Sequence, residues 1–259
     1  MRHLFIPDCQ VRPGVPTDHL EALGNYIVEK KPDVIINIGD FADMPSLSSY
    51  DAPGSKSMEN RRYHDDVNAT HEAMQRLLNP LYAHNKHAAR NKKKKYKPRM
   101  VLTLGNHEDR ITRAIEKDPV KLEGRISIDD LDYENYGWEV HQFLKPVIID
   151  NISYCHYHKN PNSPMSAPMG GMIQTKLNNF KASFSQGHNQ MFQYGVAYTG
   201  MYKRIHGLQC GSFYMHDEGF MQAQGNREHW RGIVVKNEVH DGQYDPCFVS
   251  LDFLLRNYL

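Results

Sequence analysis

Short apolar runs alternate with longer amphipathic segments in the first part of the chain. The apolar runs have the length of buried strands and cover residues 2–7, 33–38 and 100–104. Between them, residues 18–30 and 64–90 repeat apolar positions at helical spacing. Asp18 and Glu21 predict a capping box for the first helix, and Pro80 predicts a kink in the second. This strand–helix–strand alternation predicts a parallel sheet with right-handed crossovers.

The second part of the chain consists mainly of short strand candidates. These cover residues 138–143, 146–149, 152–156, 182–186, 204–210, 231–238 and 246–251. One helical segment, at 170–181, interrupts them. The predicted fold class is therefore α/β, with an α+β second half. Because no repeat or linker divides the chain, we expect one domain over residues 1–259, with insertions near 44–63, 86–99 and 160–171.

Composition narrows the class of protein but not its partner. A chain of 259 residues with 40% hydrophobic residues can bury a sizeable core. The 31 Lys and Arg nearly balance the 30 Asp and Glu, so net charge indicates no ligand, whereas 15 histidines favour a metal protein. The four cysteines form no CxxC pair, and no leader-like or membrane-spanning apolar run occurs. We therefore expect a cytoplasmic protein with no membrane contact.

Five short segments place metal-binding side chains directly after apolar strand-like runs. They are Asp8-Cys9-Gln10, Gly39-Asp40, Gly105-Asn106-His107-Glu108, His156 and Gly187-His188-Asn189-Gln190. A strand end is a rigid position, and ligands of an open sheet bind in the crevice outside the strand ends. Carboxylates, amides and imidazoles are ligands of divalent metal ions. Together the five segments predict a shared metal centre.

In this order the segments resemble the calcineurin-like metallophosphoesterase family, whose signature runs DxH, GDxxD, GNH[DE], a lone His and GHxH. The resemblance covers about residues 1–190. It implies a two-sheet sandwich flanked by helices, with two divalent ions bridged by Asp40. It also implies ligand sets for both ions: Asp8, Gln10 and Gln190 for the first, and Asn106, His156 and His188 for the second.

Two residues depart from the family pattern, and both fall on the first metal site. Gln10 and Gln190 stand where the family usually has histidines. Amide oxygens in place of imidazoles make this site harder and weaker, so it should favour Mn²⁺, Mg²⁺ or Ca²⁺ over Zn²⁺. We expect manganese, with magnesium, zinc, iron and nickel as alternatives, and unequal occupancy of the two sites. The absence of both histidines from the first site is also compatible with a single-metal enzyme or with a site that has lost activity.

The identity of the lone histidine ligand is open between His156 and His158. In a strand, alternation places residues two apart on the same face, so either imidazole could reach the metal. His156 is preferred because the family ligand is the first histidine after the strand.

The resemblance also implies catalytic roles. A metal-bound water would attack phosphorus, and His107 corresponds to the family histidine that assists the leaving group. Asp43, at the last position of GDxxD, is its expected orienting carboxylate, with Glu108 and Asp109 as alternatives. Arg110 could grip a phosphate oxygen or serve as a salt-bridge residue at a helix start.

The insertions add candidate substrate contacts. The segment 44–63, with Arg61 and Arg62, follows the Asp40 loop and could form a rim or lid. The segment 160–171 is a further expected loop near the site. The run 86–99 concentrates Lys and Arg just before the strand that leads to the GNHE motif, so it could contact a nucleic-acid backbone or be a solvated loop.

Three functions are compatible with these patterns. The expected one is a metal-dependent phosphodiesterase or nuclease acting on nucleic acid. The second is a phosphomonoesterase of the serine/threonine phosphatase type, although the Arg-Gly that usually follows GDxxD there is replaced by Met44-Pro45. The third is a metal-binding module without turnover, suggested by the two glutamines. The sequence leaves the substrate and the oligomeric state open.

Overall fold

The first of two β-sheets draws its strands from both ends of the chain. The computed structural model describes residues 1–49, 54–163, 167–200, 202–218, 225–226 and 229–259. Across this sheet the order is β11 (Gln243–Ser250), β10 (Gly232–His240), β1 (His3–Ile6), β2 (Val34–Asn37), β3 (Arg99–Thr103) and β4 (Glu139–His141). β1 to β4 are parallel, as predicted, and the β10–β11 hairpin joins the β1 edge in antiparallel register.

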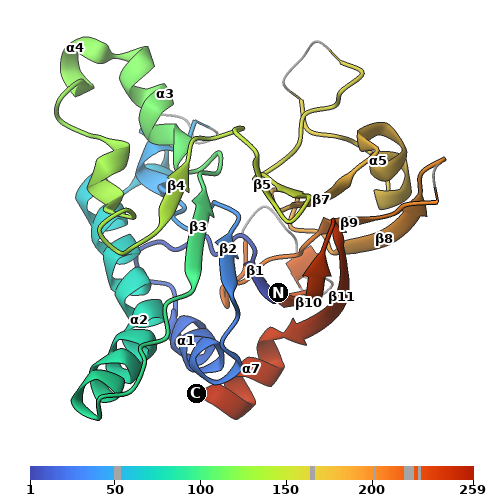
Figure 1. Cartoon of the computed structure of the whole chain (residues 1–259). Coiled ribbons are helices and arrows are strands. Elements are labelled where there is room, and N and C mark those ends of the chain that lie inside the picture. Colours follow the sequence, from blue (N-terminus) through green and yellow to red (C-terminus); the bar gives the residue numbers. More distant parts are fainter. Residues whose placement is uncertain (50–53, 164–166, 201, 219–224, 227–228) are drawn as a thin grey trace.

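The second sheet is built from the middle of the chain. Its order is β5 (Val147–Ile149), β6 (Ile152–Tyr154), β7 (Ser183–Gln186), β9 (Arg204–Gln209) and β8 (Gln193–Tyr198). The three central strands β6, β7 and β9 are parallel, and both edge strands are antiparallel. Phe5, Ile36 and Val101 of the first sheet share a buried cluster with Tyr154 and Leu208 of the second. The two sheets therefore form the predicted sandwich (Figure 1).

Helices cover the outer faces of both sheets (Figure 1). α1 (Asp18–Lys30), α2 (Tyr63–Arg90) and α7 (Leu251–Tyr258) pack on the first sheet, and α5 (Ile173–Phe180) packs on the second. Leu4 and Ile6 of β1 face the helices, while Phe5 faces the other sheet. Burial on both faces explains why these strands read as continuous apolar runs.

Several elements were not expected from the sequence. They are α3 (Asp109–Lys117), α4 (Pro119–Leu122), α7, β8 and the 3₁₀ turns η1 (Pro45–Leu47), η2 (Lys56–Met58) and η3 (Ile128–Leu131). α3 buries only Arg110 and Ile111, and β8 is half-buried along most of its length. α3 and α7 are helices of only 9 and 8 residues, and each fully buries one or two apolar side chains, too few to establish a helical period from the sequence.

The predicted capping box at the start of α1 is wrong. Thr17 is the N-cap, and its side chain makes no capping hydrogen bond. Asp18 Oδ1 instead lies 2.6 Å from Arg76 Nη1 of α2. The two helices approach closely at Gly24, where a Cβ atom would lie 2.4 Å from the Leu77 carbonyl oxygen. α2 continues past Pro80 to Arg90. The α1–α2 contact therefore depends on a glycine rather than on a cap.

The basic run 86–99 does not lie beside the strand end that carries the GNHE motif. Its first residues complete α2, and the remainder leads to Arg99 at the amino end of β3. The motif follows the carboxyl end of the same strand. The run therefore lies at the opposite end of the sheet. The other two predicted insertions fall partly on residues 50–53 and 164–166, outside the described residues.

Candidate functional site

The five predicted segments meet where parallel strands of both sheets end. Asp8, Asp40 and Asn106 follow β1, β2 and β3 of the first sheet. His156 and His188 follow β6 and β7 of the second. Because all five strands run parallel to a neighbour, their carboxyl ends share one edge of each sheet. Segments far apart in sequence are thus brought to one place.

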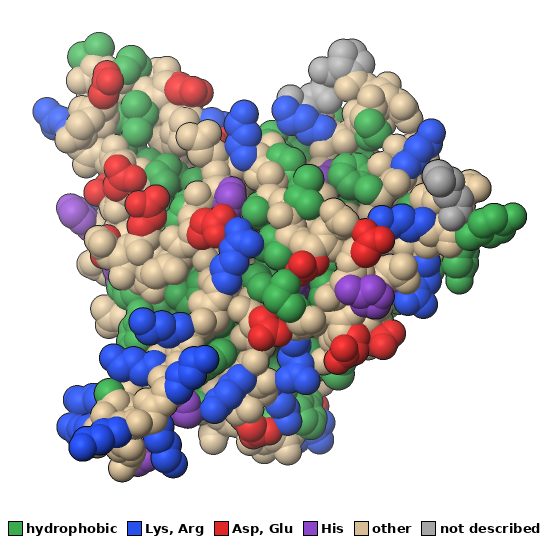
Figure 2. All heavy atoms as spheres, viewed as in Figure 1, with side chains coloured by type: hydrophobic (Ala, Val, Ile, Leu, Met, Phe, Trp, Pro, Cys, Tyr) green, Lys and Arg blue, Asp and Glu red, His purple; other side chains and the backbone are tan. Residues whose placement is uncertain are grey.

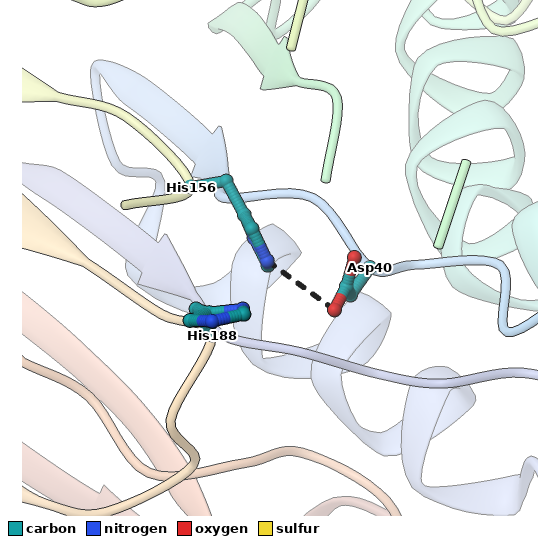
Figure 3. A group of neighbouring side chains, drawn as sticks. All are labelled: Asp40, His156 and His188. Atoms are coloured by element: carbon teal, nitrogen blue, oxygen red, sulfur yellow. Dashed lines mark ion pairs between the residues drawn. The ribbon is translucent and has the colours of Figure 1, made fainter. Parts of the chain in front are cut away.

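Asp40, His156 and His188 form a group that could hold a metal ion. Each offers a ligand atom within 4.8 Å of the others', and His156 Nε2 lies 3.3 Å from Asp40 Oδ2 (Figure 3). Asn106 Oδ1 joins them at 2.9 Å from His156 Nε2 and 2.7 Å from His188 Nδ1. Two imidazoles, a carboxylate and an amide oxygen are a suitable donor set for a divalent transition metal. The predicted second-site ligands therefore fit such an ion.

His156 is oriented by a hydrogen bond on its far side. Its Nδ1 lies 3.0 Å from the Ile38 carbonyl oxygen, which leaves Nε2 directed at Asp40. Burial disfavours the charged imidazole, but the Asp40 and Asp8 carboxylates outweigh it and raise the pKa of His156 to about 9. A metal ion would compete with that proton for the same nitrogen.

His158 lies elsewhere. β6 ends at Tyr154, so strand alternation does not reach either histidine. The His158 ring is buried against Phe180 and Phe184, with Nε2 2.9 Å from Ser153 Oγ. Burial lowers its pKa to about 4. Of the two alternatives, only His156 faces the metal-binding group.

The loops that carry the proposed ligands have unusual backbone conformations. Gln10, Asp40, His188 and Gln190 have φ of 42°, 49°, 70° and 56°, in the left-handed region that costs about 1–2 kcal/mol per non-glycine residue. Gly105 has a different role, because a Cβ there would lie 2.1 Å from Asp40 Oδ1. The glycine of the GNHE motif thus allows the backbone to pass directly against the carboxylate.

Glu108 holds two of these loops together. Its carboxylate is fully buried and accepts hydrogen bonds from the backbone N–H groups of Asp40, Ala42 and Gly105 at 2.9–3.0 Å. The Tyr133 hydroxyl donates a further one at 3.3 Å. Glu108 therefore ties the loop after β2 to the loop after β3, and it does not orient His107 as one alternative had suggested.

The predicted first-site residues lie around the His188 loop and the cleft that Asp40 lines. The Asp8 carboxylate accepts hydrogen bonds from the His188 backbone N–H at 3.1 and 3.2 Å. Gln10 and Gln190 line the same cleft as Asp40. The Tyr214 hydroxyl donates to Gln190 Oε1 at 2.7 Å, which occupies one lone pair of that oxygen. The set offers mainly oxygen donors, which suits a hard ion such as Mn²⁺ or Mg²⁺.

His107 and Asp43 form a hydrogen-bonded pair beside the metal-binding group. His107 Nδ1 lies 2.7 Å from Asp43 Oδ1, and its Nε2 lies 3.7 Å from Asp40 Oδ2. Burial alone would raise the pKa of Asp43, but His107, Arg110 and Arg12 lower it to about 2. The expected partner of His107 is therefore the one in contact, and Asp109 instead pairs with Arg113.

Two arginines hold Asp43 in place. Arg110 is buried and donates to the Asp43 carbonyl oxygen at 2.7 Å, with its guanidinium 3.4 Å from Asp43 Oδ1. Arg12 donates to Asp43 Oδ2 at 2.9 Å and to Glu218 at 3.2 Å. Arg12 and Glu218 were not predicted, because neither belongs to a motif and they lie 206 residues apart.

An open cleft of about 1140 Å³ leads to this centre. The predicted substrate contacts Arg61 and Arg62 line it, together with Arg110. Arg61 also donates to the Pro45 carbonyl oxygen at 3.0 Å, which fixes part of the segment after the Asp40 loop. The cleft therefore extends from the group formed by Asp40, His156 and His188 toward the 44–63 segment.

A polar network behind the cleft supports the His188 loop. Lys176 of α5 is buried and donates to Gln209 Oε1, which also accepts from Gln186 Nε2 at 3.2 Å. Gln209 Nε2 in turn donates to the Met191 carbonyl oxygen at 3.2 Å. These residues were missed because polar side chains inside strands and helices carry no motif.

Comparison with known proteins supports the interpretation of the site. No helix in the described part of the chain is long and apolar enough to cross a membrane. No curated protein sequence matches the chain. The family model of the calcineurin-like phosphoesterases, however, matches residues 1–195 and so includes all five segments. The chain therefore belongs to the calcineurin-like phosphoesterases, a family of metal-dependent phosphoester hydrolases.

Proposed function

We propose that the protein is a metal-dependent phosphodiesterase acting on nucleic acid, with His107 as the proton donor to the leaving oxygen. The observation that carries this proposal is the His107–Asp43 pair at 2.7 Å, beside the group formed by Asp40, His156 and His188. A structural metal module would have no use for an oriented imidazole at this position. A hydrolase does, because breaking an ester bond to a poor leaving group requires a proton.

The proposed metal ligands fall into two sets, namely Asp40, Asn106, His156 and His188 for the tighter ion, and Asp8, Gln10 and Gln190, with Asp40 shared, for the weaker. When bound, the ions would supply a water molecule that is deprotonated near neutral pH. The chain itself contributes orientation. Asp43 holds Nδ1 of His107, and Nε2 lies 3.3 Å from Arg110 Nη2 and 3.7 Å from Asp40 Oδ2, at the wall of the cleft. From there a protonated imidazole would release its proton to a leaving oxygen.

The charges around the cleft support a diester over a monoester. Arg12 and Arg110 are both paired with Asp43, so part of their charge is already balanced before a monoester dianion could bind. Among the described lining residues, six carboxylates outnumber four arginines: Asp40, Asp43, Glu59, Asp65, Asp66 and Glu218 against Arg12, Arg61, Arg62 and Arg110. A diester carries one charge per phosphate, and the open cleft leaves room for the rest of a polymer.

The test is turnover in Mn²⁺-supplemented buffer on bis(p-nitrophenyl) phosphate, p-nitrophenyl phosphate, duplex DNA and RNA. We expect the diester and nucleic acid to be hydrolysed faster than the monoester. His107→Ala should lose about 10²- to 10⁴-fold in kcat, whereas His240→Ala, at an exposed position in β10, should not. Preference for the monoester would favour a phosphomonoesterase, and metal binding without any turnover would favour a binding module.

The first metal site has a separate test. Gln10→His combined with Gln190→His replaces two amide donors by imidazoles and should tighten the weaker site toward softer ions. Metal stoichiometry and affinity, measured by elemental analysis and titration calorimetry, report this directly. Unchanged values in the double mutant would mean that these two side chains do not bind a metal.

A further inference from the structure

Seven exposed Lys and Arg side chains gather where α2 ends and the loop to β3 begins. They are Lys86, Arg90, Lys92, Lys93, Lys94, Lys95 and Lys97, and together they are called the basic surface below. The chain contains no Asp or Glu between Glu72 and Glu108. Figure 2 shows Lys and Arg side chains gathered at the lower left, over this end of α2. For a chain with a net charge of +1, this is a strong local concentration of positive charge.

The protein itself does not neutralise this charge. Glu29 pairs with Lys30 at 2.6 Å, and Glu139 pairs with Arg99 at 2.8 Å. Within the described ranges of the chain, none of the seven side chains of the basic surface forms a salt bridge. Their charge is therefore available to a partner.

Hydrogen bonds fix the backbone of the loop that carries the lysines. Tyr96 N–H donates to Asn85 Oδ1 at 2.8 Å, and Asn85 Nδ2 donates back to the Tyr96 carbonyl oxygen at 2.8 Å. The Tyr96 hydroxyl donates to the Pro32 carbonyl oxygen at 2.5 Å, and Lys93 N–H donates to the Ala88 carbonyl oxygen at 2.8 Å. A fixed backbone lowers the ordering entropy lost on binding.

The basic surface is remote from the catalytic cleft. Arg99 begins β3, and Asn106 reaches the metal centre seven residues later. At about 3.3 Å per residue this separation is roughly 20 Å. A phosphate in the cleft cannot touch the basic surface. A duplex that reached both would span roughly six base pairs, at about 3.4 Å each.

The chemistry of the surface indicates which polyanion it fits. Lysine recognises phosphate as a point charge without reading bases. Two rings lie between Lys86 and Lys97: Tyr96 is half-buried with its hydroxyl engaged, and the exposed His87 has its Nε2 3.0 Å from Asn91 Nδ2. One exposed imidazole among seven basic side chains is not the row of rings on which successive single-stranded bases stack. The only other apolar residues there are Ala88 and Ala89, which are too small to anchor in a lipid surface.

We infer that the basic surface binds the phosphate backbone of double-stranded nucleic acid, independently of base sequence and apart from the catalytic cleft. The choice of nucleic acid rests in part on the proposed function. Binding itself requires no turnover. Each lysine that neutralises a phosphate releases condensed counterions, so the affinity should fall steeply with salt.

The first experiment measures binding without catalysis. Chelator-treated protein is titrated into a fluorescent duplex of about 25 base pairs, and anisotropy is followed between about 50 and 200 mM salt. Replacing Lys92, Lys93, Lys94 and Lys95 by Ser should weaken binding at least tenfold at low salt. It should also flatten the log–log salt slope by about 0.9 for each lost phosphate contact. The matched control replaces four exposed lysines elsewhere by Ser, namely Lys117, Lys121, Lys145 and Lys181.

The outcomes separate this inference from the proposed function. Equal affinity and slope in wild type and the Lys92–Lys95 variant would overturn it, as would an equal loss in the control, which would indicate a net-charge effect. Tighter binding of single strands, or binding to phosphatidylserine vesicles but not to duplex, would overturn it in favour of another partner. Turnover of bis(p-nitrophenyl) phosphate should be the same in all three proteins. A wild type that binds duplex but hydrolyses nothing would refute only the proposed function.

Discussion

Replacing Asp43 by Asn should separate the catalytic role of His107 from metal binding. Asp43 is 5% exposed, and its carboxylate contacts His107 at 2.7 Å, Arg12 at 2.9 Å and Arg110 at 3.4 Å. Asn has nearly the same shape but no charge. It also offers one acceptor oxygen where the carboxylate has two. The imidazole would keep acceptors at the Asn side-chain oxygen and at the backbone carbonyl oxygen, but it would lose the negative charge that stabilises its protonated form, while the proposed metal ligands stay in place.

The size of the effect follows from the surroundings of the carboxylate. The pKa of Asp43 is about 2, against an ordinary value of 3.8, because His107 and the arginines outweigh the effect of burial. A depressed carboxylate pKa contributes stability that is fully present above 3.8 and is lost as pH falls through 2. At about 1.4 kcal/mol per pKa unit, Asp43→Asn should lower the unfolding free energy at pH 7 by about 2 kcal/mol. Loss of the protonated general acid should lower kcat by about 10²- to 10⁴-fold.

The assay compares two diesters that differ in their leaving group. A p-nitrophenolate leaves with little help, whereas an alkoxide needs a proton, so Asp43→Asn should harm the alkyl ester more. Glu218→Gln is the matched control, because Glu218 also pairs with Arg12 but does not contact His107. Metal content should match wild type in both variants. An equal loss on both esters, or an equal loss in Glu218→Gln, would refute the assignment of Asp43 as the orienting group.

Three further substitutions probe the centre and its support. Asp40→Asn should lose bound metal by elemental analysis while circular dichroism stays native, and retention of a full metal complement would contradict its ligand role. Glu108→Gln turns an NH₂ group toward the backbone donors of Ala42 or Gly105, so urea unfolding should show that the unfolding free energy falls by about 2–4 kcal/mol. A fall of less than about 0.5 kcal/mol would refute the role of Glu108 in tying the two loops together. Burial lowers the pKa of His19 to about 4 from 6.5, so stability should fall by about 3 kcal/mol as pH drops from 6.5 to 4, and His19→Gln should flatten that dependence. An unchanged pH profile in that variant would exclude His19 as the source.

Much of the fold was predictable because the strands are apolar on both faces. The runs that became β1, β2 and β3 stand out in sequence, and each ends at a motif whose chemistry is visible residue by residue. β8 and α3 were not predictable in the same way. α3 fully buries one apolar side chain over nine residues, and β8 fully buries none, so neither element gives a pattern long enough to recognise.

The site was predictable in its ligands but not in its supports. Asp40 and His156 can be recognised in the sequence because each follows a strand. Glu108 instead binds backbone groups of the loops after β2 and β3, and no local sequence pattern reveals those contacts. The basic run 86–99 was expected beside the metal-binding motif, but it lies at the other end of β3. It adjoins the strand that leads to the motif, but a strand has two ends, and residues that are neighbours in sequence can lie at opposite edges of a sheet.

The left-handed conformations of Gln10, Asp40, His188 and Gln190 set a limit on how the protein can be made more heat-stable. Strain at such positions is ordinarily relieved by glycine, which adopts positive φ without penalty. Here each substitution would delete a proposed ligand together with the strain. Consensus or library approaches that reward stability alone would therefore select against the metal centre. A thermostable variant that keeps its chemistry must gain its stability elsewhere, for example in the packing of α1 against α2.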